Sequence, residues 1–452
     1  MRPRDAAVKH PSAMRIAFIT AGAAGMFCGS CMRDNTLAAA LRKLGHDALL
    51  IPTYTPIRTD ETDVSQHRVF FGGINVFLQQ KAWLFRHTPW LLDRLLDFPR
   101  LLRWVSRFAS RTKYSDLYDL THSMLRGRHG KQRKELAKLT NWLAADVKPD
   151  VVLLTNALLS GLVADVKQAL GVPVLVTLQG DDVFLDAFEP KLRQTLIDQI
   201  RGNDAAVDGY ICTSAAYADH MAAYLGVGRA KMHVVYPGIN LAGYSADRPP
   251  RNAAVTIGYF ARICREKGFQ NVVDAFVALR KSEGAPAAKL KASGWLGDND
   301  RPFFAEQVAK LTAAGLAADF EHVECPDHAS KVAFFQSIDV FSVPVSFHEP
   351  KGLSVLEAWA NGVPVVQPRR GSYPELLAAT GGGLIVEPDD PLALAAGLRS
   401  LLEDADLRAR LGTAGAAGVR AKFTADVMAA ETDAVLARYA RKSEPERQRR
   451  SG

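Results

Sequence analysis

Two glutamates lie eight residues apart in the segment FHEPKGLSVLEAWANGVPVV, which begins at Phe347. Pro350 and Gly352 prevent one continuous helix through this segment, so we expect Glu349 in a loop and Glu357 inside the helix that follows. A loop that leads into a helix N-terminus is a natural anion site, because free backbone N–H groups and the helix dipole both face the ligand. Two carboxylates beside such a site suggest a ligand that carries both phosphates and hydroxyls. The alternative is a capping carboxylate and a surface glutamate.

Two cations follow a predicted strand in the segment GYFARICREKGFQNVV, at Arg262 and Lys267. The carboxyl ends of parallel strands are where α/β proteins bind ligands. A guanidinium and an ammonium there would stabilise the negative charge of a departing diphosphate without a metal. The alternative is a surface loop in which Arg265 and Glu266 form salt bridges.

A glycine-rich loop, GAAGMFCGS, follows the first predicted strand at Gly22–Ser30. It lacks the G-x-G-x-x-G pattern, so binding of a nicotinamide or flavin cofactor is unsupported, and a plain tight turn is an equal alternative. Cys28 and Cys31 form a C-x-x-C at a predicted helix start, where a lowered thiol pKa would favour a redox pair. We interpret the C-x-x-C spacing as coincidental and without a redox function. A zinc site would need two more ligands, and the sequence has no second C-x-x-C pair.

Two acidic clusters are candidate metal ligands, Asp181-Asp182 and Asp298-Asn299-Asp300. Turn chemistry explains the second cluster, and we expect no metal at either. We also expect no cofactor, and the sequence contains no Walker A loop, no G-x-S-x-G and no H-E-x-x-H motif.

Short apolar strands alternate with amphipathic helices on both sides of a polar segment at 240–252. This alternation predicts two parallel sheets, each covered by helices on both faces, with ligands bound between the carboxyl ends of the strands. The last long helix, at about 404–440, contains Gly412, Gly415 and Gly418, and we expect it to break there. The strands expected are 14–20, 48–51, 69–78, 151–155, 174–178, 209–213, 233–236 and 255–261, and the helices 37–45, 158–170, 186–201 and 215–225.

A basic and aromatic segment interrupts the first series at about 80–130. Residues 81–148 carry 15 Lys and Arg against 6 Asp and Glu, whereas the whole chain has a net charge of +8. Such a patch favours an anionic partner such as lipid headgroups, and a solvated helical face is the alternative. No recognised nucleic-acid-binding module is present, so we expect no nucleic-acid partner.

Composition places the chain among globular proteins of two or three domains. It has 452 residues, 48% of them hydrophobic, and no apolar run long enough to span a bilayer. Five scattered cysteines and the absence of an apolar leader favour the cytoplasm, with peripheral attachment to the inner face of the membrane as an alternative.

The segments EPKGLSVLEAWANGVPVV, ARICREKG, LAAALRKLGHDALL and VVYPGIN together resemble the retaining, GT-B-type glycosyltransferases of family 4. The first domain also resembles glycogen and starch synthases, more weakly, around FFGGINVFLQQ. The resemblance implies two doubly wound Rossmann-like domains that face a central cleft. It places the acceptor-side domain at 14–239, the domain for the nucleotide-sugar at 253–425, and a C-terminal helix at 426–441 that crosses back to the first domain.

The resemblance also implies roles for individual residues. Arg262 and Lys267 would hold the donor diphosphate, Glu349 would contact the sugar hydroxyls, and Glu357 would hydrogen-bond the ribose. Backbone N–H groups would bind sugar and phosphate, and Gly29 would approach the donor. The residues that supply those N–H groups are Lys351, Gly352 and Leu353.

This chain departs from the family pattern at two positions. Cys28-Gly29 stands where the family usually has two glycines, and Gln179 stands where it commonly has a histidine beside the reacting sugar. A glutamine can donate a hydrogen bond but carries no charge. The resemblance as a whole implies a metal-independent hexosyltransferase that retains the α configuration. A catalytically weak or inactive nucleotide-sugar-binding protein of the same fold is the alternative.

The acceptor is left open by the sequence. It is either a carbohydrate or a small metabolite bound in the first domain, or a lipid-linked molecule at an anionic membrane contacted through residues 81–148.

Overall fold

The structure is a computed structural model that describes residues 13–22, 28–66, 114–247 and 254–451. The predicted strand at 69–78 and most of the basic and aromatic segment, residues 67–113, lie outside these described residues. The chain divides into two compact units. Unit 1 comprises Met1–Thr213, Ala218–Tyr236 and Asp426–Gly452, and unit 2 comprises Ser214–Tyr217 and Pro237–Ala425.

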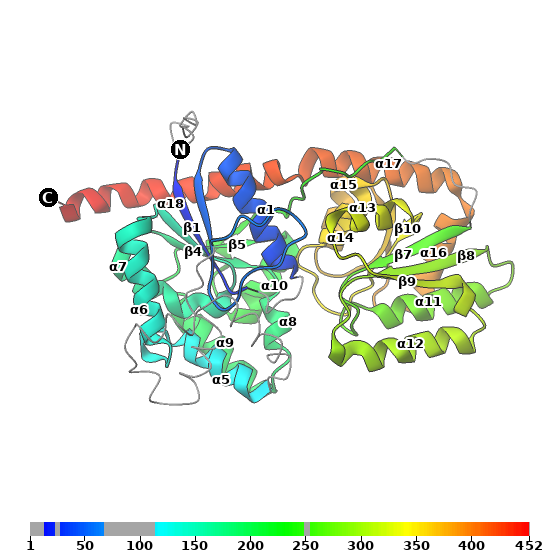
Figure 1. The fold of residues 1–452 in the computed structure, drawn as a ribbon, viewed down its shortest axis with the longest axis horizontal. Coiled ribbons are helices and arrows are strands. Elements are labelled where there is room, and N and C mark those ends of the chain that lie inside the picture. The colour runs from blue at the N-terminus through cyan, green and yellow to red at the C-terminus, as the bar shows by residue number, and fades with distance from the viewer. Residues whose placement is uncertain (1–12, 23–27, 67–113, 248–253, 452) are drawn as a thin grey trace, which may run out of the picture. The chain divides into compact units, whose positions relative to one another are not determined.

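Unit 1 is built on a parallel six-stranded sheet with the strand order β2-β1-β3-β4-β5-β6 (Figure 1). Its middle strands consist of buried residues throughout, because helices cover both faces of the sheet and an apolar run is stable only in such a place. The strands are β1 Arg15–Thr20, β2 Asp47–Pro52, β3 Val151–Leu154, β4 Val174–Leu178, β5 Gly209–Cys212 and β6 Met232–Val234.

The helices of unit 1 follow the predicted alternation, but several bounds differ. The helix expected at 186–201 begins only at Pro190, because Glu189 is extended and Pro190 occupies the first position of the helix. The helix expected at 37–45 begins at Gly29, and the first residues of the helix expected at 158–170 form a 3-10 helix, Ala157–Leu162. The helices are α1 Gly29–Lys43, α5 Tyr114–Leu125, α6 Arg133–Trp142, α7 Val163–Leu170, α8 Asp181–Leu185, α9 Pro190–Asn203, α10 Ala215–Leu225 and α18 Ala425–Ser451.

Unit 2 contains a second parallel six-stranded sheet, in the order β12-β11-β10-β7-β8-β9 (Figure 1). The strand order reverses between β7 and β10, as in a doubly wound nucleotide-binding fold. The strands are β7 Val255–Phe260, β8 Ala288–Ser293, β9 Phe320–Val323, β10 Val340–Phe341, β11 Val365–Pro368 and β12 Gly383–Val386. The helices are α11 Phe269–Lys281, α12 Arg301–Ala313, α13 His328–Gln336, α14 Leu353–Ala360, α15 Tyr373–Thr380, α16 Pro391–Glu403 and α17 Ala405–Lys422.

The predicted break of the last helix at its glycines is wrong. α17 runs through all three glycines and ends at Lys422, and the chain bends at Phe423 before α18 begins. The glycines are close-packing positions, because a Cβ at Gly412 would meet the backbone of Gly362 and one at Gly415 would meet the Trp359 ring. These glycines therefore allow the close approach of the segment at Trp359 and Gly362, and they do not interrupt the helix.

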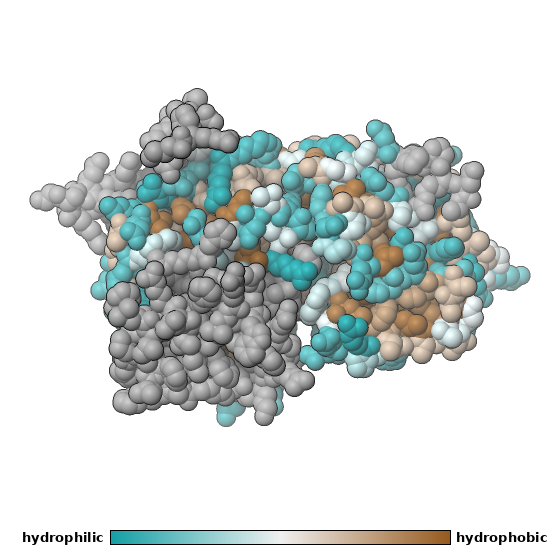
Figure 2. Space-filling model, viewed as in Figure 1, coloured by the Kyte–Doolittle hydropathy of each residue, from teal (hydrophilic) through white to brown (hydrophobic). Residues whose placement is uncertain are grey.

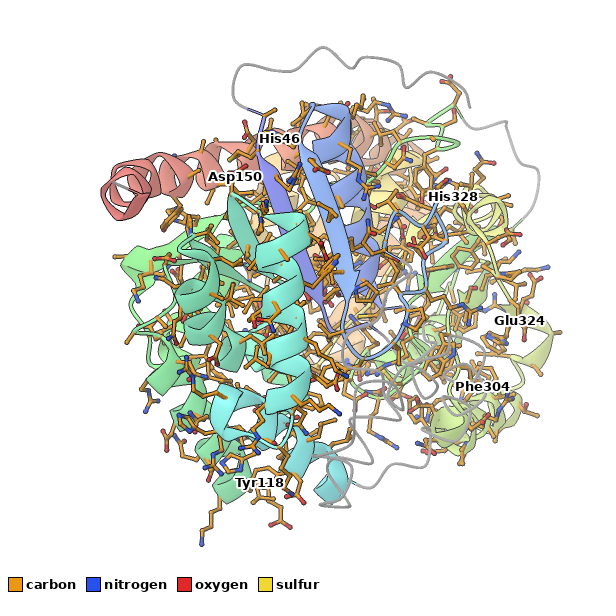
Figure 3. All side chains as sticks on the ribbon, turned by 60° about the vertical axis from the view of Figure 1, so that its left-hand side comes forward. His46, Tyr118, Asp150, Phe304, Glu324 and His328 are labelled. Atoms are coloured by element: carbon orange, nitrogen blue, oxygen red, sulfur yellow. The ribbon has the colours of Figure 1, made fainter. Side chains whose placement is uncertain are left out.

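α18 packs within unit 1. Lys43 pairs with Asp426 at 2.7 Å, and His46, which follows α1 and is labelled in Figure 3, lies 3.2 Å from Asp433. Further along α18, Val435 is buried. The helix therefore joins the first sheet's unit, although it follows the second sheet in the chain.

Figure 2 shows a mixture of hydrophilic and hydrophobic residues over the visible face of unit 2. Within the described ranges, no helix is both long enough and apolar enough to cross a bilayer.

Candidate active site

The candidate site in unit 2 lies where the strand order of its sheet reverses. The loop after β7 and the first turn of α11 are both hydrogen-bonded to the loop after β10. The Ser346 N–H donates to the Glu266 carbonyl at 3.0 Å, and Asn271 Nδ2 on α11 donates to the Pro344 carbonyl at 3.2 Å. Gly268 has φ of 73°, and a Cβ on it would collide with the Pro344 carbonyl. Glycine is therefore required where the two loops meet.

A buried tyrosine supports the loop that carries the two cations. Tyr259, at the end of β7, places its hydroxyl 3.1 Å from the Arg262 carbonyl and 3.3 Å from the Lys267 carbonyl. Its single hydrogen can serve either oxygen. Burial raises the pKa of Tyr259 well above its ordinary value, so the hydroxyl stays protonated and available as a donor.

Lys267 and Glu349 form an ion pair across the two loops. Lys267 Nζ lies 2.6 Å from Glu349 Oε2 and 4.7 Å from the centre of the Phe347 ring. Glu349 is 5% exposed. Burial raises the pKa of Glu349, but the charges of Lys267 and Lys351 and the hydrogen bonds outweigh burial, so the pKa lies below its ordinary value. The carboxylate is therefore ionised at neutral pH.

The segment after Glu349 forms the start of α14. Glu349 Oε1 accepts from the Lys351 N–H at 3.3 Å and the Gly352 N–H at 3.2 Å, and Gly352 has φ of 64°. Among the described residues, the N–H groups of Leu353 and Ser354 have no hydrogen-bond acceptor. These donors and the positive end of the helix dipole are available to an anion.

Glu357 is the fifth residue of α14 and is buried. Its Oε1 accepts from Lys331 Nζ at 2.6 Å and from the Tyr244 hydroxyl at 3.2 Å. The two glutamates singled out in the sequence thus form separate ion pairs, one at each end of the segment 349–357. Both are buried, so neither is the surface glutamate of the alternative interpretation.

Arg262 has weaker partners than Lys267. Its side chain is 43% exposed and lies 3.8 Å from Glu266, with Nε 3.2 Å from Cys264 Sγ. Arg265 contacts Glu306 at 3.7 Å. The guanidinium of Arg262 is therefore accessible to a ligand on the same loop as Lys267.

The remaining predicted site residues, Gly29 and Gln179, belong to unit 1. Gly29 is the first residue of α1, and residues 23–27 of the preceding loop lie outside the described residues. Gln179 is 2% exposed, and its Nε2 donates to the Thr155 carbonyl at 2.9 Å and lies 3.3 Å from both Asp34 carboxylate oxygens. Asp34 also pairs with Arg33 at 3.2 Å. Gln179 is thus held by buried polar groups of its own unit.

The C-x-x-C pair consists of free thiols. A hydrogen bond with Cys28, followed by burial, raises the pKa of Cys31. A raised pKa opposes the thiolate that a reactive redox cysteine requires.

The acidic clusters have structural partners. Asp181 accepts from the Ala157 N–H at 2.6 Å and the Gln179 N–H at 3.0 Å, and Asp182 lies 3.0 Å from His220 Nε2. Asp298 pairs with Arg301 at 3.0 Å. The described part of the chain contains no group of three or more His, Cys, Asp and Glu side chains arranged for a metal ion.

Sequence reasoning missed Lys331 and Tyr244. Lys331 is a buried cation among the apolar residues of α13, and Tyr244 lies in the polar segment interpreted as a linker. The available signal was a lysine next to the apolar run Val332–Phe335, because a buried ammonium needs a counter-charge.

Comparison with known families matches both halves of the chain. Residues 246–417 match the family described as Glycosyl transferases group 1, and residues 35–238 match the Glycosyl transferase 4-like domain. The two matches cover most of both sheets described above.

Curated relatives include glycogen synthase of Mycobacterium tuberculosis and D-inositol 3-phosphate glycosyltransferase of Corynebacterium urealyticum. The first is 26% identical over 288 residues, which are 63% of this chain and 66% of the relative. The second is 31% identical over 236 residues, which are 49% of this chain and 54% of the relative. The matches therefore cover between about half and two thirds of these relatives.

Solved structures of similar fold include sucrose-phosphate synthase from Thermosynechococcus elongatus, with a TM-score of 0.69, 18% identity and coverage of 94% of this chain and 98% of that one. The structure of Anabaena HepE in complex with UDP and glucose has a TM-score of 0.64 and 16% identity, and the match covers 94% of this chain and 99% of HepE. These likenesses confirm the predicted two-sheet GT-B fold.

Proposed function

Because the chain belongs to the Glycosyl transferases group 1 family, we propose that it transfers a sugar from a nucleoside diphosphate sugar to a hydroxyl of an acceptor. The observation that carries this proposal is the Lys267–Glu349 pair at the start of α14, where an ammonium, a carboxylate and unpaired backbone N–H groups lie together. The cations and N–H groups suit a diphosphate, and the carboxylate suits sugar hydroxyls.

The proposed chemistry depends on electrostatic stabilisation of the leaving group. Negative charge develops on the diphosphate as the bond to the sugar breaks, and Arg262, Lys267 and the start of α14 would stabilise it. Glu349 would orient the sugar through its hydroxyls. Since these groups supply the positive charge, the proposed reaction needs no metal or other cofactor.

We propose that the reaction retains the α configuration. A double displacement needs a carboxylate free to attack the sugar carbon. Both Glu349 and Glu357 are already paired with lysines in unit 2. This favours a front-face reaction, in which the acceptor hydroxyl attacks the sugar carbon from the same side that the diphosphate leaves.

UDP-sugars are the first donors to test, because HepE, a protein of similar fold, was solved with UDP-glucose. A thermal-shift screen of UDP-, GDP- and ADP-sugars, with and without EDTA, would identify a donor that raises the melting temperature by binding the folded state. Product analysis by NMR would then give the configuration of the new bond. A donor that binds without turnover with any acceptor would favour the alternative, a nucleotide-sugar-binding protein, for which the uncharged Gln179 is the motivating residue.

For the acceptor, the proposal includes a carbohydrate, a small metabolite or a lipid-linked molecule. The basic composition of residues 81–148 is the basis for the lipid-linked alternative, which would place the protein at the inner face of the membrane. Co-sedimentation with anionic liposomes at low and high salt tests it. Binding that salt abolishes supports the membrane acceptor, and absence of binding at low salt removes it.

A further inference from the structure

A buried arginine in unit 1 lies near the carboxyl ends of the strands of the first sheet. Arg33 is the fifth residue of α1, which follows β1, and it is 2% exposed. The strand order of this sheet reverses between β1 and β3. In open α/β sheets, ligands bind outside the carboxyl ends of the strands at such a reversal. The diphosphate site proposed above uses the corresponding place in unit 2, whereas Arg33 has no role in it.

Contacts within unit 1 fix the surroundings of this arginine. Gln179, the first residue after β4, places Nε2 3.3 Å from both carboxylate oxygens of Asp34 and donates to the carbonyl of Thr155 at 2.9 Å. Thr155 is the first residue after β3. Asn35 is fully buried and donates to the Thr62 carbonyl, beyond β2, at 3.0 Å. The start of α1 is therefore joined to the ends of several strands by buried polar groups.

One edge of the Arg33 guanidinium has no partner. Nη1 donates to Asp34 Oδ1 at 3.2 Å, whereas Nε and Nη2, which are both buried, have no hydrogen-bond partner within the described ranges of the chain. Adjacent residues of a helix do not face each other, so Asp34 reaches a single nitrogen. Burial lowers the pKa of Arg33 and Asp34 opposes this effect, but an arginine keeps its charge in a protein. Buried N–H groups of a cation are costly when nothing accepts from them, so a ligand that does so is stabilised here.

The free edge has the geometry of an oxyanion site. Nε and Nη2 form the fork that binds a carboxylate or a phosphate through two parallel hydrogen bonds. Asp34 does not complete this fork, because its carboxylate lies between Nη1 and the Gln179 amide. A sugar hydroxyl offers one oxygen, whereas an oxyanion offers two and also balances the charge. Because the two nitrogens are shielded from solvent, neighbouring side chains have to move when the oxyanion enters.

We infer that Arg33 determines the class of acceptor: it binds a phosphate or carboxylate group of the acceptor, so that anionic acceptors are preferred over neutral ones. The inference rests on the proposed function, in which the donor binds to unit 2 and the acceptor needs a site of its own. A soluble phosphate ester and the headgroup of an anionic lipid both carry the phosphate that this fork would bind.

Calorimetric titration of the full chain with matched neutral and anionic molecules tests the inference. The probes are glycerol, glycerol 3-phosphate and glycerate, and glucose, glucose 6-phosphate and glucuronate, in a buffer without phosphate. The nucleoside diphosphate that binds most tightly is present at saturation, so that the diphosphate site of unit 2 is filled. An anionic probe of at least one set should bind about tenfold more tightly than its neutral counterpart, or better.

Arg33→Lys is the informative variant, because it keeps a positive charge beside Asp34 but removes the fork. It should lose most of the preference for anionic probes, while its affinity for the nucleoside diphosphate stays at the wild-type value. The matched control is Arg193→Lys, which changes an arginine that lies 2.9 Å from Asp186 in a more exposed pair. This control should keep the full preference.

Co-sedimentation with vesicles of phosphatidylglycerol or phosphatidylcholine distinguishes the two sources of a phosphate. Binding to the anionic vesicles that Arg33→Lys removes identifies a lipid headgroup, and binding of a soluble probe that Arg33→Lys removes identifies a soluble acceptor. If neither preference exists in the wild type, or if Arg33→Lys leaves the preference unchanged, the inference is overturned.

Two further outcomes remain decisive. If Arg33→Lys does not fold, an experimental structure of the wild type with its tightest anionic probe decides: an oxyanion within hydrogen-bonding distance of Arg33 Nε and Nη2 supports the inference, and an oxyanion bound elsewhere overturns it. If the wild type binds no nucleoside diphosphate, the proposed function fails, whereas binding of an anionic probe that depends on Arg33 would still support an oxyanion site in unit 1.

Discussion

Lys267 and Glu349, which are 82 residues apart in the chain, lie 2.6 Å from each other at the reversal of the second sheet. The carboxylate side chain is 6% exposed, whereas the lysine side chain is 26% exposed. In the proposed reaction the more exposed ammonium would contact the diphosphate, and the carboxylate would hold the ammonium in place and accept from the sugar hydroxyls. This preorganisation is what stabilisation of a leaving group requires.

Removal of this ammonium should slow transfer. We expect Lys267→Ala to lower turnover by about 100-fold, because a charge-stabilising donor is lost at the leaving group, and Arg262→Ala to act in the same direction. Initial rates with saturating donor measure the effect, and Lys310→Ala is the surface control. Near-normal turnover in both variants would contradict the assigned roles.

The pKa of Glu349 predicts how stability changes with pH. Because this pKa is lowered below the ordinary 4.5, the ionised carboxylate stabilises the fold above pH 4.5, and that contribution is lost as pH falls through the folded-state pKa. Glu349→Gln should therefore be less stable than the wild type at neutral pH, and the difference should narrow below pH 4.5. Denaturant unfolding at several pH values measures it. A difference that stays constant down to strongly acidic pH would refute the prediction.

Removal of the Tyr259 hydroxyl should weaken donor binding, because this hydroxyl supports the loop that carries Arg262 and Lys267. Tyr259→Phe keeps the ring but leaves the Arg262 and Lys267 carbonyls without this donor, which costs about 1–3 kcal/mol for a buried unsatisfied group. We expect a lower donor affinity together with a loss of stability of this size, measured by calorimetric titration and denaturant unfolding. Unchanged donor affinity would show that the loop does not need this support.

Alanine substitutions at two helical glycines should change the free energy of unfolding in opposite directions. A Cβ at Gly415 in α17 would meet the Trp359 ring, so Gly415→Ala should destabilise the protein by about 1–3 kcal/mol. A Cβ at Gly202 in α9 would meet nothing within 4 Å, so Gly202→Ala should stabilise it by about 0.4–1 kcal/mol. Urea unfolding compares them, and equal effects would contradict the packing role given to Gly415.

Local sequence patterns predicted the elements of the fold well. β4 at Val174–Leu178 and α10 at Ala215–Leu225 have the predicted bounds, because buried apolar runs and helical periodicity are local signals. The glycines of α17 were misinterpreted because their reason, the approach of Trp359 and Gly362, depends on segments far away in the chain.

The residues of the candidate site could be predicted from the sequence, but their ion-pair and hydrogen-bond partners could not. Loop and helix signals placed Glu349 and Glu357 correctly, since Pro350 and Gly352 act locally. The partners of buried charges are tertiary: Lys331 lies 26 residues from Glu357, and Asp34 lies 145 residues from Gln179. No pattern along the chain reports such a contact.

An experimental structure of the full chain with bound UDP tests the central claim most directly. We predict the diphosphate within hydrogen-bonding distance of Lys267 Nζ and the N–H groups of Leu353 and Ser354, with Arg262 turned toward the same phosphates. A diphosphate bound elsewhere in the chain, with these groups directed away from it, would contradict the account.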